Sequence, residues 1–139
     1  MKVVVDASVA VKWFVEEDGS DAATRLLENR GARFGLRELV APEFLLLEVV
    51  AVIGRRERSK AVQADYPAQV LRALRRLRLN LTPNAELLDH ATQLSVTLRH
   101  PVYDCLYLAL SRRFSAHLAT FDAGLGDIAR RDGRLWELR

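Results

Sequence analysis

The 139-residue sequence has little cysteine, glycine and proline, and each shortage excludes a class of protein. Its single cysteine, Cys105, leaves no disulfide framework, and no Cys/His cluster has the spacing of a zinc site. Seven glycines and four prolines, without any low-complexity segment, exclude collagen-like and disordered chains. We therefore expect a single domain over residues 1–139 that folds in a reducing, cytoplasmic setting.

Long hydrophobic runs and a leader segment are also missing. The longest apolar run, residues 44–53, is interrupted by Glu48 and is far too short to cross a bilayer. The N-terminus starts with strand-forming residues and has no basic segment before an apolar one. We therefore expect neither a signal peptide nor a membrane partner.

The net charge of +3 hides an uneven distribution along the chain. Residues 1–54 carry 6 basic and 9 acidic side chains, whereas residues 55–139 carry 15 basic and 9 acidic ones. The second excess is mostly arginine, whose planar guanidinium matches phosphate oxygens. These arginines indicate either a polyanionic partner or a solvated helix face, and the sequence leaves both open. They are Arg55, Arg56, Arg58, Arg72, Arg75, Arg76, Arg78, Arg112, Arg113, Arg130, Arg131 and Arg134.

The first eight residues contain an apolar strand that ends at an acid. Residues 3–5 are all valine, and such a run without polar alternation is typical of a strand buried on both faces of a parallel sheet. Asp6 follows at the carboxyl end of the strand, where ligand sites of open α/β sheets lie. The alternative is that Asp6 or Ser8 only caps the helix expected over residues 9–15.

The rest of the pattern predicts alternating helices and short strands. This alternation favours an α/β fold with a parallel central sheet between two layers of helices. We expect helices over residues 22–29 (capped by Ser20 and closed by Gly31), 43–56, 66–77, 85–98 (capped by Asn84) and 101–110, and strands over residues 39–41, 79–82, 118–121 and 134–138.

The helix expected over residues 43–56 has an acid in its middle. The helix is apolar almost all round, so we expect it to be buried. Glu48 would then be a lone carboxylate in an apolar setting, which is costly unless it is paired or bound to a cation. A buried salt bridge to an arginine is the structural alternative. Glu43 belongs to the first turn, where an acid complements the helix dipole, and it points away from Glu48.

Two more acids stand beside apolar sequence in the last third of the chain. Asp104 interrupts the apolar residues 102–110, although an acid in a first turn also answers the helix dipole. Asp122 follows the strand expected over residues 118–121, as Asp6 follows the first strand, and its alternative role is again a helix cap. His100 is expected to be a helix-start or surface residue and not a ligand.

The topology brings these acids to one edge of the sheet. The four acids Asp6, Glu48, Asp104 and Asp122 are not matched by an equal number of buried bases. Lys12 is a basic residue close to Asp6 in sequence. A carboxylate cluster cannot stay ionised at neutral pH without cations.

Mg²⁺ or Mn²⁺ prefers such oxygen ligands, and two such ions can activate a water and stabilise the leaving oxygen of a phosphodiester. The hydroxyls of Ser8 and Thr120 are placed to orient a carboxylate or a metal-associated water. The residues therefore predict a metal site with hydrolytic chemistry.

Four segments resemble, in order, the motifs of the PIN-domain ribonucleases, and especially the VapC toxins of bacterial and archaeal toxin–antitoxin pairs. They read VVDASVAVKWF, APEFLLLEV, VYDCLYLAL and LATFD, and together they span the chain. The resemblance implies a PIN fold, endonucleolytic cleavage of RNA, dependence on Mg²⁺ or Mn²⁺, a homodimer and a cognate antitoxin that blocks the site. It implies catalytic and metal-binding roles for Asp6, Glu48, Asp104 and Asp122, and polar roles near them for Ser8 and Thr120.

The hypothesis is that Asp6, Asp104 and Asp122 hold the metal, while Glu48 is a further ligand or orients the attacking water. The sequence departs from the family at residues 49–51, where many relatives have an asparagine, and Asp127 matches no motif position.

Other classes of protein fit the sequence less well. A haloacid-dehalogenase-like phosphatase has a second aspartate two residues after the first, whereas Ser8 stands there. A receiver domain has adjacent acids after the first strand and a late lysine, and neither is present. Two alternatives within the PIN fold remain: an RNA-processing nuclease outside toxin–antitoxin systems, and a non-catalytic binding module.

Overall fold

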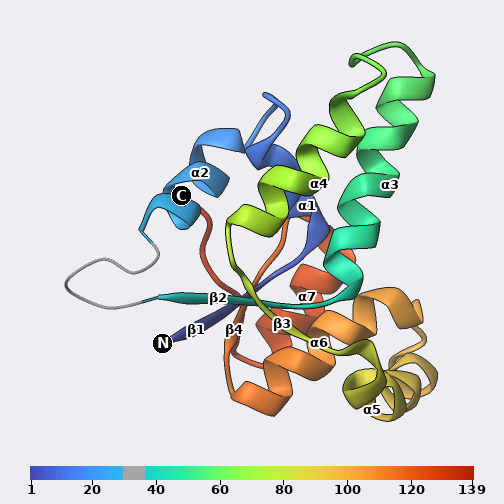
Figure 1. Cartoon of the computed structure of the whole chain (residues 1–139). Coiled ribbons are helices and arrows are strands. Elements are labelled where there is room, and N and C mark those ends of the chain that lie inside the picture. The colour runs from blue at the N-terminus through green and yellow to red at the C-terminus, as the bar shows by residue number, and fades with distance from the viewer. Residues whose placement is uncertain (30–36) are drawn as a thin grey trace.

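A four-stranded parallel sheet forms the centre of the molecule (Figure 1). The structure, a computed structural model, describes residues 1–29 and 37–139. The strand order is β3-β2-β1-β4, and Val4 of β1 aligns with Val40 of β2 and with Leu118 of β4. The predicted parallel sheet is confirmed. Its strands are β1 (Lys2–Val5), β2 (Glu38–Pro42), β3 (Asn80–Thr82) and β4 (His117–Ala119).

Helices cover both faces of the sheet, so the predicted three-layer α/β/α arrangement is confirmed. In Figure 1, α1 to α4 lie above the sheet and α5 and α6 lie below it. Helix α6 contacts β1, β2 and β4, and α7 packs against β4 and α6. The helices are α1 (Ala7–Ala10), a 3₁₀ turn (Val11–Trp13), α2 (Ser20–Glu28), α3 (Phe44–Arg58), α4 (Tyr66–Arg76), α5 (Asn84–Leu98), α6 (Val102–Phe114) and α7 (Ala123–Arg131).

The core forms where β1 lies between the two helical layers. The three valines of β1 are fully buried, as the unbroken β-branched run predicts. Burying each valine side chain contributes roughly 1.5–3 kcal/mol.

Within residues 1–29 and 37–139 no helix has the length and apolar character needed to span a bilayer.

The strand order creates a switch point at the carboxyl ends of β1 and β4. After β1 the chain adds β2 and then β3 on one side, and it later returns to add β4 on the other side. Open α/β sheets bind ligands in the crevice at such a point. Val5 aligns with Ala119, and the Asp6 amide donates to the Ala119 carbonyl at 3.3 Å. The two strands therefore end together, as the sequence predicts.

Helix α3 is not buried all round, contrary to the sequence-based expectation. Its inward face consists of Leu45, Val49 and Ile53, spaced four residues apart. Leu47 is 64% exposed on the opposite side, whereas Phe44, Leu46 and Val52 are partly buried against the core.

Two predicted helix caps are wrong. Ser20 is the first residue of α2 and not its N-cap, which is Gly19 with a φ of 90°. The Ser20 hydroxyl donates to the Val15 carbonyl at 3.0 Å. Asn84 is the first residue of α5, and its Oδ1 accepts from the Phe44 amide at 3.0 Å. Asn84 thus satisfies the start of α3 rather than the start of its own helix. Gly31 lies outside the described residues.

Two predicted strands are shorter than expected. Strand β4 ends at Ala119 instead of residue 121, because the next amides turn to side-chain acceptors: the Phe121 amide donates to Ser8 Oγ and the Asp122 amide to Thr120 Oγ1. The strand expected over residues 134–138 is reduced to one bridge, between Leu118 and Leu135.

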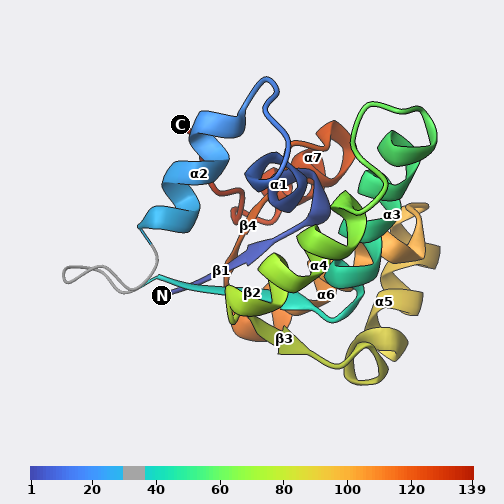
Figure 2. The same ribbon diagram turned by 45° about the horizontal axis from the view of Figure 1, so that its top comes forward.

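The chain leaves the sheet after that bridge. Its end lies beside α2, where Arg25 Nε donates to the Arg139 carbonyl at 2.7 Å (Figure 2).

Candidate active site

Asp6 lies at the switch point and is 5% exposed. Its Oδ1 accepts from Ser8 Oγ at 2.6 Å and from the Val9 amide at 3.3 Å, and its Oδ2 accepts from the Thr120 hydroxyl. Asp6 therefore caps α1, as the alternative interpretation held, and also faces the site. Burial raises the pKa of Asp6 to about 6 although these hydrogen bonds lower it, and the nearby charge of Glu48 raises it further.

The hydroxyls of Ser8 and Thr120 connect the ends of β1 and β4. Ser8 Oγ accepts from the Phe121 amide at 2.8 Å, and Thr120 Oγ1 accepts from the Asp122 amide at 2.9 Å. Each hydroxyl thus donates to Asp6 and accepts from the backbone that leads to Asp122. This arrangement fixes the two acids relative to each other, and a role in orienting a metal-associated water stays a prediction.

Glu48 reaches the same edge from α3 and is half-buried. Its Oε1 accepts from the Tyr107 hydroxyl at 2.7 Å, so its partner is a tyrosine of α6 rather than an arginine. Burial raises the pKa of Glu48, and the charges of Asp104 and Asp122 raise it further, while Tyr107 and Arg55 lower it. Glu48 is thus close enough to the two aspartates for their charges to repel.

Asp104 and Asp122 lie close to a third group, the His100 ring. His100 Nε2 lies 2.8 Å from Asp104 Oδ2, and one ligand atom from each of His100, Asp104 and Asp122 lies within 4.8 Å of the other two. Asp122 Oδ2 also accepts from the Leu125 amide at 2.7 Å and so caps α7.

The expectation that His100 is no ligand is therefore at odds with its position. The missed signal is spacing, because a residue four positions before Asp104 lies on the same side of a helix start.

The four predicted acids converge on one edge of the sheet. The charge of Glu48 acts on Asp6, and those of Asp104 and Asp122 act on Glu48. The Tyr107 hydroxyl has its pKa raised by burial first and then by Glu48, Asp6 and Asp104. The predicted position of the acids agrees with the structure, and their catalytic roles stay predictions.

A hollow of ≈260 Å³ opens beside Glu48. Lys12 points to this hollow and pairs with Glu17 at 3.1 Å, not with Asp6, and its Nζ lies 4.8 Å from the centre of the Phe121 ring. Arg56 pairs with the other Glu17 oxygen at 2.7 Å. The hollow is lined by Ala7, Ser8, Val11, Lys12, Glu17, Glu48, Val52, Arg56 and Phe121.

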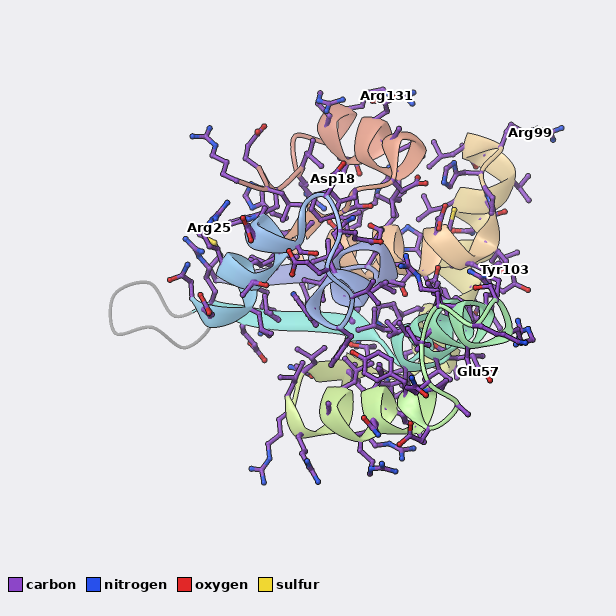
Figure 3. All side chains as sticks on the ribbon, turned by 90° about the horizontal axis from the view of Figure 1, so that it is seen from above. Asp18, Arg25, Glu57, Arg99, Tyr103 and Arg131 are labelled. Carbon is purple, nitrogen blue, oxygen red and sulfur yellow. The ribbon has the colours of Figure 1, made fainter. Side chains whose placement is uncertain are left out.

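The arginines of the second half have mixed roles. Arg112 forms a two-pronged pair with Asp132 at 2.8 and 3.0 Å, which ties α6 to the end of α7. Arg130 pairs with Asp127 on the surface of α7. Arg131, like Arg99 after α5, projects outward in Figure 3. Part of the arginine set therefore serves structure, and part remains on solvated faces, where it can meet a polyanion.

The donor set fits a divalent cation. Carboxylate oxygens are the ligands that Mg²⁺ and Mn²⁺ prefer, and their mutual repulsion falls when a cation lies among them. Gly124 leaves room for the cluster, because a Cβ there would lie 3.2 Å from His100 Cε1 and 3.5 Å from Asp122 Oδ2.

Known proteins share this architecture. Ribonuclease VapC3 of Pyrobaculum aerophilum is 28% identical over 129 residues, which cover 91% of this chain and 94% of that protein. The crystal structure of Mycobacterium tuberculosis VapC20, a toxin that cleaves the sarcin–ricin loop, has a TM-score of 0.71 at 16% identity over 91% of this chain and 94% of that one. PAE2754 from Pyrobaculum aerophilum has a TM-score of 0.69 at 15% identity over 91% of this chain and 78% of that one.

At these identities the two crystal structures establish a shared fold. The family model of the PIN domain matches residues 3–131, which are nearly the whole chain. The chain belongs to the PIN domain family.

Proposed function

We propose that this protein is an endoribonuclease that depends on Mg²⁺ or Mn²⁺ and acts as the toxin of a VapBC-type toxin–antitoxin pair. The observation that carries the proposal is the convergence of four carboxylates at the switch point of the sheet, where the charge of Glu48 acts on Asp6 and the charges of Asp104 and Asp122 act on Glu48. Membership of the PIN domain family and similarity to a protein named as a ribonuclease support it.

Three aspartates would hold the metal. Asp6 follows β1, Asp104 lies in the first turn of α6, and Asp122 lies between β4 and α7. Glu48 would be a further ligand or the group that orients water. A bound divalent ion supplies positive charge next to the phosphodiester and its attacking water.

The protein's own groups hold the reacting parts in place. Ser8 and Thr120 fix the Asp6 carboxylate, and Tyr107 fixes the Glu48 carboxylate through a 2.7 Å hydrogen bond. The pKa of Glu48 is raised by burial. A carboxylate with a higher pKa is a stronger base, so it accepts a proton from an attacking water more readily. Glu48 would therefore accept a proton from that water or orient it.

Basic groups beside the hollow would contact the RNA backbone. Lys12 and Arg56 line the hollow, and the charge of Arg55 acts on Glu48. Phosphate contacts of this kind weaken as salt rises because condensed counterions are released on binding. RNA affinity that stays constant between low and high salt would contradict this part of the proposal.

The partners would be a cognate antitoxin and a second copy of the chain, in the cytoplasm. Large apolar side chains remain at the surface of α3, α5 and α6, and such side chains are typical of contact surfaces. They are Leu47, Leu88, Val96 and Tyr103 (Tyr103 is labelled in Figure 3). The VapC names of the relatives support the pairing with an antitoxin.

Cleavage of labelled total RNA by the purified protein tests the proposal, with Mg²⁺ or Mn²⁺ and with EDTA. Asp122→Asn removes one charge at the cluster, and Asp127→Asn is its matched control on the same helix, since Asp127 is exposed and paired with Arg130. We expect metal-dependent cleavage by the native protein and by Asp127→Asn, and a loss of about 100-fold or more in Asp122→Asn.

Equal cleavage by both variants would refute the assignment of Asp122. Cleavage that persists in EDTA would refute the metal-dependent reaction.

A further inference from the structure

His100 is placed at the acid cluster by the start of α6. The residue lies just before Pro101, which caps that helix, and its Nε2 reaches back to Asp104 Oδ2 at 2.8 Å. The side chain of His100 is 17% exposed, so the ring is largely covered while it faces the cluster.

The backbone of His100 is held from several sides. Its amide donates to the Ser95 carbonyl at 3.2 Å, and its carbonyl accepts from Ser95 Oγ at 2.7 Å. The preceding residue, Arg99, has a φ of 55°, which turns the chain sharply between α5 and α6. The ring is therefore presented by a fixed corner, as a ligand that must keep its geometry requires.

The Cε1 corner of the ring faces α7. A Cβ on Gly124 would lie 3.2 Å from His100 Cε1, the carbon between Nδ1 and Nε2, and 3.5 Å from Asp122 Oδ2. The absence of a side chain at Gly124 thus leaves space that His100 and Asp122 share. One ligand atom of Asp104 completes a group in which all three atoms lie within 4.8 Å of one another.

These distances suit neighbouring ligands of one cation. Two ligands at about 2.1 Å from an ion and at right angles to each other lie about 3.0 Å apart, and opposite ligands lie about 4.2 Å apart. The 2.8 Å hydrogen-bond distance between His100 Nε2 and Asp104 Oδ2 is close to the first value, and the ligand atom of Asp122 lies within 4.8 Å of both.

We propose that His100 Nε2 is a direct nitrogen ligand of the cation held by Asp104 and Asp122, and that it makes the site prefer Mn²⁺ over Mg²⁺. This proposal rests on the proposed function, because it concerns the same metal site. Imidazole binds transition metals well, whereas Mg²⁺ favours oxygen ligands almost alone. A site of three or four carboxylates would lack this contribution of a nitrogen ligand to the preference.

Pulsed EPR of the full chain loaded with Mn²⁺ tests the proposal directly. A directly bound imidazole nitrogen couples to the Mn²⁺ electron spin, whereas a histidine that only hydrogen-bonds to Asp104 does not couple in this way. We expect ¹⁴N coupling in the native protein and in the control His90→Gln, which changes an exposed histidine of α5, and no such coupling in His100→Gln.

Affinity for each ion gives a second measurement. Mn²⁺ affinity follows from loss of the free-ion EPR signal, and Mg²⁺ affinity follows from competition with Mn²⁺. We expect His100→Gln to weaken Mn²⁺ binding about tenfold and to weaken Mg²⁺ binding much less. Gly124→Ala keeps the histidine but adds a methyl group close to His100 Cε1, which would displace the ring. This variant should reduce both the ¹⁴N coupling and the Mn²⁺ preference.

The outcomes separate this proposal from the proposed function. If the native protein binds Mn²⁺ and shows no ¹⁴N coupling, or if the coupling persists in His100→Gln, His100 is not the ligand and the nuclease assignment stands. If the native protein binds neither ion, both proposals fail together.

Discussion

Asp6→Asn should stabilise the metal-free protein at neutral and alkaline pH. The wild-type carboxyl is buried at the switch point, and burial raises its pKa from 3.8 to about 6. The folded state therefore binds this proton more tightly than the unfolded state does. Stability from this group is fully present below pH 3.8 and is lost as the pH rises through about 6.

The magnitude follows from the two pKa values. The gap between 3.8 and about 6 corresponds to about 3 kcal/mol lost by pH 8. Asparagine has nearly the same shape: its oxygen can still accept from Ser8 and the Val9 amide, and its amide can donate to Thr120 Oγ1. The variant keeps the bonds from Ser8 and Val9, reverses the bond with Thr120, and never carries the buried charge.

Urea unfolding with EDTA present measures this effect in both proteins. We expect the free energy of unfolding of Asp6→Asn, relative to wild type, to rise by about 2 kcal/mol between pH 4.5 and pH 8. Adding Mg²⁺ or Mn²⁺ at pH 8 should raise the stability of wild type more than that of the variant, which has lost one of the carboxylates. A stability difference that is the same at both pH values would refute the reasoning.

Three further predictions concern neighbouring contacts. Tyr107→Phe removes the hydroxyl that donates to Glu48, so it should lower the free energy of unfolding by about 1–2 kcal/mol in urea titrations. It should also raise the pKa of Glu48, which the pH profile of cleavage measures. An unchanged profile would count against the role of Glu48. Arg112→Ala should cost about 1 kcal/mol by loss of its two-pronged pair with Asp132, and 1 M salt should reduce that cost if the pair is its source. Leu47→Lys should shift sedimentation toward the monomer with no loss of thermal stability; a native protein that is already monomeric would refute the proposed homodimer.

The sheet and the positions of the acids were predictable because they depend on local patterns. The unbroken valine run of β1 indicates a strand buried on both faces, and parallel strands end at the same edge. Asp6 and Asp122 therefore come together from their places in the sequence alone. The family resemblance adds the order of the motifs, and the PIN domain match confirms it.

Other features depend on contacts between distant segments. Asn84 looks like a cap for its own helix, yet its oxygen accepts from the start of α3, and only the approach of the two helix starts decides between these roles. The outward turn of Leu47 depends on which face of α3 meets the core. His100 was set aside because a single histidine carries no signal, and its closeness to Asp122 arises only when α7 packs beside α6.

The most direct test of the central claim is RNA cleavage by wild type and Asp6→Asn in one experiment, with Mn²⁺, with Mg²⁺ and with EDTA. We predict that wild type cuts RNA only with a divalent ion, and that Asp6→Asn folds at least as stably but does not cut. Cleavage by Asp6→Asn at the wild-type rate, or by wild type in EDTA, would contradict a metal-dependent nuclease site at the end of β1.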